Sequence, residues 1–214
     1  ASKASFIKAL AASGGASTLT EFHVSGDQKL TVTTAIDFDG TAAGALTTGT
    51  ISAAESTGGV ALAATTGENV TFVGGSGNDS IDFTSGFATY DSVDGGDGSD
   101  KILITFEDAA TIDPILTSFE SLDLFFNGES NLDFSMISDI DVVNIYGSTA
   151  PVSLSNIPFD LTNFNISGSQ TGAWSLAFED NGDSSANLNW SNNTGSAVTL
   201  ASLAFEEVKL VSFV

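Results

Sequence analysis

The sequence GGSGNDSIDFTSGFATYDSVDGGDGSDKILI, residues 74–104, contains the same pattern twice. Residues 74–82 and residues 95–103 both read G-G-x-G-x-D-x-U-x, where U is an apolar residue, and they begin 21 residues apart. Each segment runs directly into an alternating apolar pair, Ile81/Phe83 or Ile102/Ile104, which is typical of a β-strand with one face in a core. A glycine turn that recurs at a fixed interval before the same kind of strand indicates a coiled chain that returns to the same position once per rung.

The apolar pairs continue on both sides of this stretch, in steps of 20 or 21 residues with a single step of 24. The first series comprises Val60/Leu62, Ile81/Phe83, Ile102/Ile104, Leu122/Leu124, Val143/Ile145, Phe164/Ile166, Leu188/Trp190 and Val208/Leu210. A second series lies between them: Val70/Phe72, a weaker Tyr90/Val93, Ile112, Leu132/Phe134, Val152/Leu154, Trp174/Leu176 and Val198/Leu200. The longer step contains the polar residues 179–185, as expected for an insertion in a loop.

This constant return predicts an all-β fold, a parallel β-helix or β-roll solenoid with about 21 residues per rung. A hairpin meander also produces alternating strands, but it does not require a fixed return, whereas stacked rungs do. Residues 51–214 are expected to form the solenoid, and residues 1–50 a β-rich segment of irregular rungs. A third inward column is expected three residues before the first series, at Phe119, Ile140, Leu161 and Phe205. Outward positions are expected at Asp123, Asn144, Asn165 and Lys209.

Composition excludes several classes of protein. The chain has 214 residues, 27 acidic side chains, five lysines and no arginine, which gives a formal charge of −22. Such a chain offers no basic surface for nucleic acid or anionic lipid. It has no cysteine for disulfides or thiolate zinc sites, and no apolar run approaches the roughly 20 residues of a membrane span. Because 42% of its residues are hydrophobic, we expect a folded chain in which something offsets the repulsion among the acids.

The glycine–aspartate segments carry the chemistry of a site for a hard cation. Glycines leave backbone carbonyl groups uncovered, and the aspartate at the sixth position, Asp79 or Asp100, supplies negative charge. The apolar residue two positions later anchors the loop in the core. Two such loops stacked one rung apart would bring both aspartates and both sets of carbonyls around a shared site.

At residues 74–103 the sequence resembles the RTX calcium-binding repeats of bacterial proteins exported by type I secretion. The resemblance implies Ca²⁺ as the cofactor, with Asp79 and Asp100 as side-chain ligands. It also implies carbonyl ligands from Gly74, Ser76, Gly95 and Asp97, with Gly75, Gly77, Gly96 and Gly98 as further candidates. Nearby carboxylates are weaker candidates: Asp82, Asp91, Asp94 and the side chain of Asp97. Only two full motifs are present, so one or two ions are expected rather than a long stack.

A broader resemblance, to the repeat regions of RTX surface-layer (S-layer) proteins of Gram-negative bacteria, covers residues 50–214. The segments that carry it are 56–60, 69–75, 91–96, 118–122 and 204–208. It implies a secreted chain that folds on binding calcium and assembles at the bacterial cell surface through homotypic lattice contacts, with a cell-surface polysaccharide as a further candidate partner. Two other acidic loops, 37–40 and 180–183, are interpreted as ordinary turns.

Two other functions fit the same fold. One is an adhesin, or an RTX accessory module of a secreted enzyme, which would stay monomeric in calcium. The other is a β-helix polysaccharide hydrolase or epimerase. His23 is interpreted as structural or exposed, and the acidic pairs Asp139/Asp141 and Asp123/Asp133 as chance pairs among many acids, so no enzyme activity is expected. Trp174 and Trp190 fall on inward positions, which favours core packing over stacking on sugars.

Overall fold

The computed structural model describes most of the chain. The described residues are 5–7, 20–36, 38, 48–64, 69–83, 87, 90–107, 110–112, 114–148, 150–158, 161, 163–170, 172–179, 185–190, 202–206 and 210–213. Side chains are described within residues 20–179 only, and not for residues 110–112, 169 and 170. Within these residues all regular structure is β-strand, every strand pairing is parallel, and no helix is long and apolar enough to cross a membrane.

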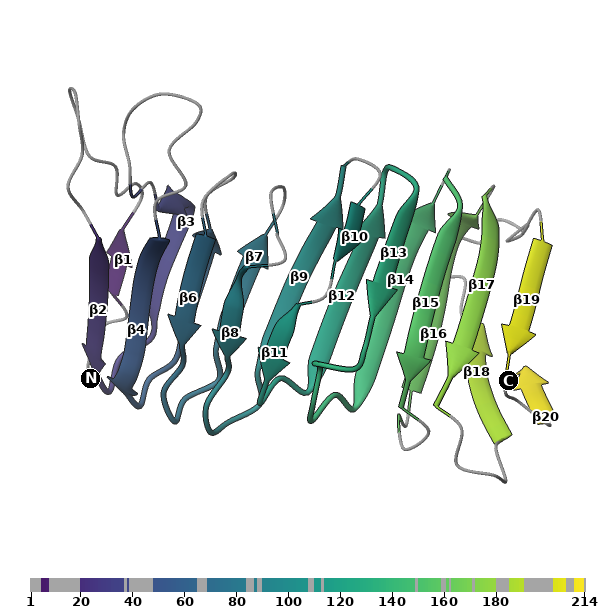
Figure 1. Ribbon diagram of the computed structural model, residues 1–214. Coiled ribbons are helices and arrows are strands. Elements are labelled where there is room, and N and C mark those ends of the chain that lie inside the picture. The colour runs from purple at the N-terminus through teal and green to yellow at the C-terminus, as the bar shows by residue number, and fades with distance from the viewer. Residues whose placement is uncertain are drawn as a thin grey trace.

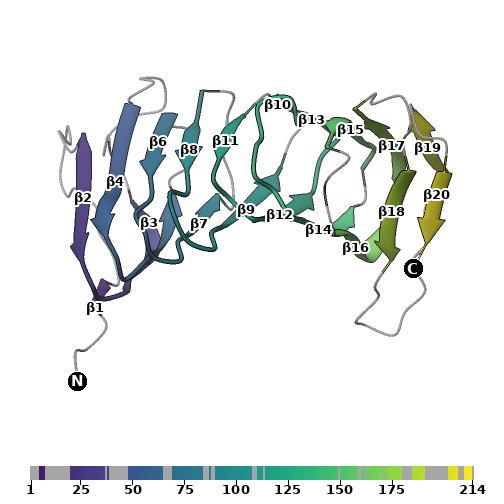
Figure 2. The ribbon, with the colours of Figure 1, turned by 90° about the horizontal axis from the view of Figure 1, so that it is seen from below.

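The strands form a β-solenoid whose two layers face each other along its whole length (Figures 1 and 2), as the sequence predicted. One layer is a single ten-stranded sheet, here called the long sheet. Its order is β1 (Ser5–Ile7), β3 (Leu30–Ile36), β5 (Val60–Ala64), β7 (Ser80–Phe83), β9 (Lys101–Phe106), β12 (Ser121–Phe126), β14 (Val142–Ser148), β16 (Asn163–Gln170), β18 (Ser185–Trp190) and β20 (Leu210–Phe213).

The other layer consists of two five-stranded sheets. The N-terminal sheet has the order β2 (Glu21–Gly26), β4 (Thr48–Ser56), β6 (Asn69–Val73), β8 (Ser92–Asp94) and β11 (Ile115–Thr117). The C-terminal sheet has the order β10 (Ala110–Ile112), β13 (Ser130–Asp133), β15 (Val152–Ile157), β17 (Ala173–Phe178) and β19 (Ser202–Glu206). Successive strands therefore alternate between the layers, except where β10 and β11 follow each other.

Register along the long sheet follows the predicted first series from Ile81 to Leu188. The stacked inward residues are Ile81, Ile102, Leu122, Val143, Phe164 and Leu188. Two predicted pairings are wrong. Ile81 stacks on Leu62 and not on Val60, and Leu188 stacks on Phe213, while Val208 lies outside the described residues. Both errors arise because neighbouring strands offer several apolar residues at two-residue spacing, so hydrophobicity alone permits more than one register.

The second layer changes sheets in the rung that contains Pro114. Proline has no backbone N–H and interrupts a strand, and here it separates β10 from β11. The prediction of Ile112 as the sole apolar residue of this rung missed β11, whose Leu116 is fully buried and stacks on Val93. The predicted inward position of Tyr90 is also wrong, because its side chain is 73% exposed in the turn before β8.

The third predicted column is only partly correct. Phe119 and Ile140 are buried and Leu161 is half-buried against the core, but Phe205 lies in β19 and stacks on Leu176 in the C-terminal sheet. The segment 202–206 thus takes the second-series position that was assigned to Val198/Leu200, which lies outside the described residues.

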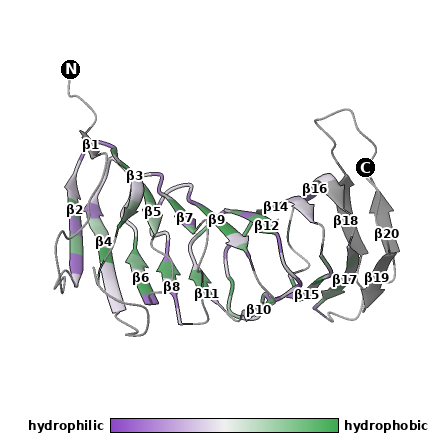
Figure 3. Ribbon diagram, turned by 90° about the horizontal axis from the view of Figure 1, so that it is seen from above, coloured by the Kyte–Doolittle hydropathy of each residue, from purple (hydrophilic) through white to green (hydrophobic). Residues whose placement is uncertain are grey.

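The core is a continuous apolar filling between the two layers. Figure 3 shows hydrophobic residues on strands of both layers, and the inward Phe106 and Phe126 rings stack with centroids 4.8 Å apart. Trp174 is 2% exposed and packs edge-on to Phe126, which confirms its interpretation as a core residue. The side chain of Trp190 lies outside the described side chains.

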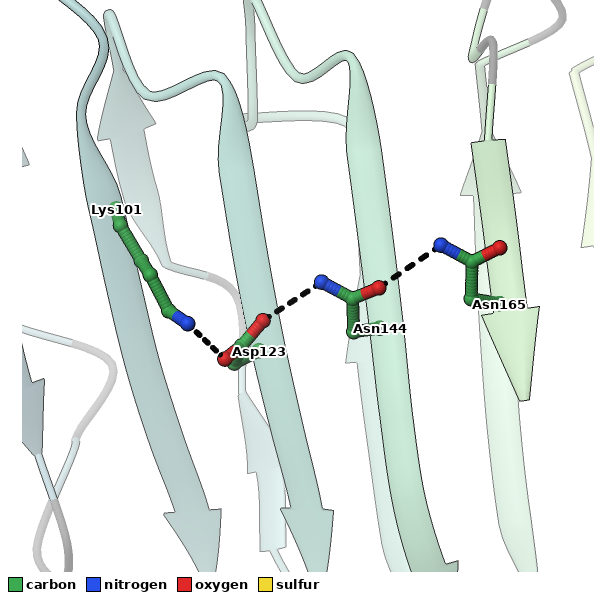
Figure 4. A network of polar contacts seen from close by, with 4 residues as sticks. All are labelled: Lys101, Asp123, Asn144 and Asn165. Carbon is green, nitrogen blue, oxygen red and sulfur yellow. Dashed lines mark hydrogen bonds and ion pairs between the residues drawn. The ribbon is translucent and has the colours of Figure 1, made fainter. Parts of the chain in front are cut away.

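The outer face of the long sheet carries a ladder of polar side chains across four rungs (Figure 4). Lys101 forms an ion pair with Asp123, which accepts a hydrogen bond of 2.8 Å from the Asn144 amide. Asn144 in turn accepts one of 2.9 Å from Asn165. Asp123 occupies its predicted outward position but is only 3% exposed, because these neighbours cover it. Asp123, Asn144 and Asn165 occupy equivalent positions of adjacent rungs, so their hydrogen bonds favour one register. Lys101 reaches Asp123 diagonally, from the position that pairs with Ser121.

We expect Asn144→Ala to lower the free energy of unfolding by about 1–2 kcal/mol, because it removes two side-chain hydrogen bonds at a part-buried position. Asn165→Ala is the matched comparison, since it removes one of these bonds. Urea denaturation measures both variants, and an Asn144→Ala protein as stable as wild type would show that the ladder contributes no stability.

Candidate metal site

The two glycine motifs form adjacent turns at one edge of the solenoid. They connect β6 to β7 and β8 to β9, and both turns lie at the lower edge in Figure 1. Backbone hydrogen bonds join each turn to its neighbours: Ser76 N donates to Ser56 O at 3.0 Å, and Asp97 N donates to Gly75 O at 2.8 Å. The predicted stacking of the two motifs, one rung apart, is therefore present.

Glycine is required at the first position of each motif because the neighbouring rung lies against it. A Cβ atom on Gly74 would lie 1.8 Å from the carbonyl oxygen of Gly95, and one on Gly95 would lie 1.9 Å from the carbonyl oxygen of Ser118. The motif carboxylates face the same positions: Asp79 Oδ2 lies 2.6 Å from the first point and Asp100 Oδ2 lies 2.9 Å from the second. At each motif a carbonyl oxygen and a carboxylate oxygen thus converge where a side chain is missing.

Asp79 is buried and held by backbone donors at both oxygens. Val60 N donates to Oδ1 at 2.7 Å, from the preceding rung, and Gly75 N donates to Oδ2 at 2.9 Å, from its own loop. Burial raises the pKa of this carboxyl, while the two N–H groups and the nearby charge of Lys29 act in the opposite direction. The pKa of Asp79 remains raised, but each of its carboxylate oxygens has a hydrogen-bond donor.

Asp100 is equally buried, at 1% exposure, but is much less well compensated. Asp79 N donates to its Oδ1 at 2.6 Å, whereas its buried Oδ2 has no hydrogen-bond partner. Burial raises the pKa of Asp100 to about 7, and the negative charges of Asp79, Glu120 and Asp94 add to this rise. An unpaired buried carboxylate oxygen beside an uncovered carbonyl fits a divalent cation, which would supply positive charge and bind both oxygens.

Glu120 belongs to this cluster although the sequence motif does not include it. Its Oε2 accepts a hydrogen bond of 2.6 Å from Asp100 N, so it repeats one rung later the contact that Asp100 makes with Asp79. Two residues earlier, Ser118 has a φ of 57°, an uncommon backbone conformation for a residue other than glycine. An acidic residue stands at the same turn position in three successive rungs: Asp79, Asp100 and Glu120. This repetition is the sequence signal that could have identified Glu120.

The remaining candidates are distributed around these loops. Asp94 accepts a hydrogen bond of 3.2 Å from Gly96 N beside the second motif, and the side chain of Asp97 is exposed. Asp91 is buried at the other end of β8, where it accepts a bond of 2.7 Å from Val70 N, so it does not join the loops. Asp82 lies on β7; its buried Oδ1 has no partner and burial raises its pKa.

Glu120 also lies near acidic residues of later turns. Glu120, Asp139, Asp141 and Glu179 line a cavity of about 510 Å³, together with residues of the turns 137–141. These charges add to the negative potential around the loops and would attract cations. Asp123 and Asp133, the other pair considered for hydrolysis, lie in different layers, on β12 and β13. His23 is exposed and lies 3.1 Å from Glu21, as its interpretation predicted.

No group of three or more histidine or acidic side chains among the described residues is arranged to hold a metal ion alone. A cation at the second motif would therefore use carbonyl oxygens as well as carboxylates. The acidic loops 37–40 and 180–183 lie outside the described residues, apart from Phe38.

Comparisons with protein-family models, with curated proteins and with solved structures found no match to this chain. The resemblance to RTX and surface-layer proteins therefore rests on the motif residues themselves, and the fold alone is common to enzymes and to non-catalytic proteins.

Proposed function

We propose that this chain is a calcium-binding structural segment of a secreted bacterial surface-layer protein of the RTX type. In this proposal calcium binds at the stacked glycine loops, and the chain folds and self-assembles at the cell surface. The observation that carries the proposal is the buried carboxylate of Asp100, whose Oδ2 has no partner and which faces the carbonyl oxygen of Ser118 across Gly95. Calcium prefers such a mixture of carboxylate and carbonyl oxygens.

The charge of the chain supports a role for calcium in folding. With a formal charge of −22, the folded state concentrates negative charge that the unfolded chain keeps apart. A cation that binds only the folded state stabilises it by about 2.7 kcal/mol when its free concentration is 100 times Kd. Extracellular calcium modules have Kd values of about 10⁻⁴–10⁻³ M, so such a chain stays open where calcium is scarce and closes outside the cell.

The geometry favours a structural role over catalysis. The carboxylates of Asp79, Asp100 and Glu120 accept hydrogen bonds from backbone N–H groups of neighbouring rungs, so they hold the rungs together. A cation bound there would join consecutive rungs through oxygens that both contribute.

Thermal unfolding followed by circular dichroism tests the calcium proposal. We expect the midpoint to rise continuously as calcium is added to chelator-treated protein, with a much smaller effect of magnesium, which demands a stricter octahedral shell. Equal midpoints in chelator and in millimolar calcium would refute it.

Electron microscopy with and without calcium tests assembly. Sheets that form only with calcium support a lattice, whereas single particles in both conditions favour an adhesin or accessory module.

A further inference from the structure

The two motifs have the same sequence pattern but different hydrogen bonding. In the first, the N–H of its second glycine, Gly75, donates to the motif aspartate at 2.9 Å. In the second, the corresponding N–H of Gly96 donates to Asp94 instead, at 3.2 Å. Asp94 therefore takes the donor that would otherwise satisfy Asp100 Oδ2, and this oxygen remains buried without a partner. The first loop is closed by its own backbone, and the second is not.

The charged groups around the two motif aspartates also differ. Lys29 stabilises the ionised form of Asp79, whereas Asp100 is surrounded by the carboxylates of Asp79, Asp94 and Glu120. A cation entering the first loop would have to displace hydrogen bonds that are already made. A cation at the second loop would neutralise the charge of Asp100, for which the only hydrogen bond described is the one from Asp79 N to Oδ1.

The side of the second loop that faces the next rung offers oxygens from outside the motif. The Ser118 carbonyl oxygen and Asp100 Oδ2 both approach the open position at Gly95. Glu120, two residues after Ser118, already places its carboxylate on the Asp100 backbone N–H at 2.6 Å. The segment 118–120 thus occupies the position of a third loop although it lacks the glycine pattern.

We propose that the chain holds one divalent cation, bound between the second glycine loop and the turn 118–120, with Asp100, Glu120 and the Ser118 carbonyl among its ligands. The first motif holds no ion and acts as a hydrogen-bonded support for the second. This inference rests on the proposed calcium-binding function and assigns the site and the stoichiometry within it.

Isothermal titration of the chelator-treated protein with calcium chloride tests this assignment. We expect one ion per chain in wild type and in Asp79→Asn, and no detectable binding in Asp100→Asn. Glu120→Gln should weaken binding at least about tenfold, because affinity follows the charge of the ligands. Glu107→Gln is the control, since it removes an exposed charge at the far end of β9 and keeps the oxygen that accepts a hydrogen bond from Asn127.

The outcomes separate the two proposals. Calcium binding with two ions in wild type, or with wild-type affinity in Glu120→Gln, would overturn the assignment and leave calcium binding intact. Absence of binding to folded wild-type protein would overturn both. Wild-type stoichiometry does not depend on any variant, so the test stands even where Asp79→Asn folds poorly through loss of an acceptor for Val60 and Gly75.

Discussion

Replacing Gly74 with alanine is expected to lower the free energy of unfolding by about 3 kcal/mol or more. The added Cβ would lie 1.8 Å from the carbonyl oxygen of Gly95 and 2.5 Å from its carbonyl carbon. These are backbone atoms of the next rung, so they cannot rotate away as a flexible side chain can. The clash also falls where Gly74 N donates to Asp94 O at 2.7 Å, so relieving it separates the rungs.

Gly26→Ala is the matched control for this effect. Gly26 has a φ of 115°, but a Cβ built on it meets no atom within 4 Å, so the substitution tests backbone strain without crowding. We expect a cost of about 1–2 kcal/mol for Gly26→Ala. Urea denaturation in calcium-free buffer compares the two variants. A Gly74→Ala protein no less stable than Gly26→Ala would show that the rungs separate without penalty and that glycine serves another purpose there.

The fold was predictable from sequence because a solenoid repeats one requirement at a fixed interval. Every residue that stacks with Ile102 in the core must be apolar, so the interval of about 21 residues between these apolar positions is visible in the sequence alone. The prediction failed where the requirement is met twice. Val60 and Leu62 are both apolar and both buried, so hydrophobicity does not show which of them stacks on Ile81. The observed register is consistent with the hydrogen bond from Val60 N to Asp79, which a hydrophobic pattern does not contain.

The candidate site was predictable in position but not in detail. The motif identifies Asp79 and Asp100 as equivalent, since each is the sixth residue of the same pattern. Their difference depends on hydrogen bonds with residues outside the nine-residue pattern: Val60 on one side, and Asp94 and Glu120 on the other. The Val60 and Glu120 contacts join residues about 20 positions apart, so no local pattern contains them, whereas Asp94 lies directly before the second motif.

Asp100→Asn is expected to stabilise the calcium-free protein by up to about 4 kcal/mol above pH 7, although it removes a residue of the proposed calcium site. The carboxyl of Asp100 has its pKa raised from 3.8 to about 7 in the folded chain, chiefly by burial. Ionisation therefore costs more in the folded state than in the unfolded state. Asparagine keeps an oxygen that can accept the hydrogen bond from Asp79 N but carries no charge.

The sign of the pH dependence follows from proton binding. Below about pH 4 the carboxyl is protonated in both states, so it imposes no penalty. Between about pH 4 and pH 7 the folded chain binds more protons than the unfolded chain at this group, and stability falls as pH rises. Above pH 7 the penalty is complete. Wild type and Asp100→Asn should therefore have similar stability near pH 4 and differ most near pH 8.

Calcium should reverse this order at pH 8. Wild type gains the free energy of binding, whereas Asp100→Asn lacks the charged ligand and gains little, so the variant that is more stable in chelator becomes less stable in calcium. Urea denaturation at pH 4 and pH 8, with chelator and with millimolar calcium, measures all four conditions. Glu107→Gln, which removes an exposed charge outside the proposed site, should follow wild type throughout. If Asp100→Asn were no more stable than wild type at pH 8 in chelator, the buried carboxylate would already be compensated within the chain and would have no need of a cation.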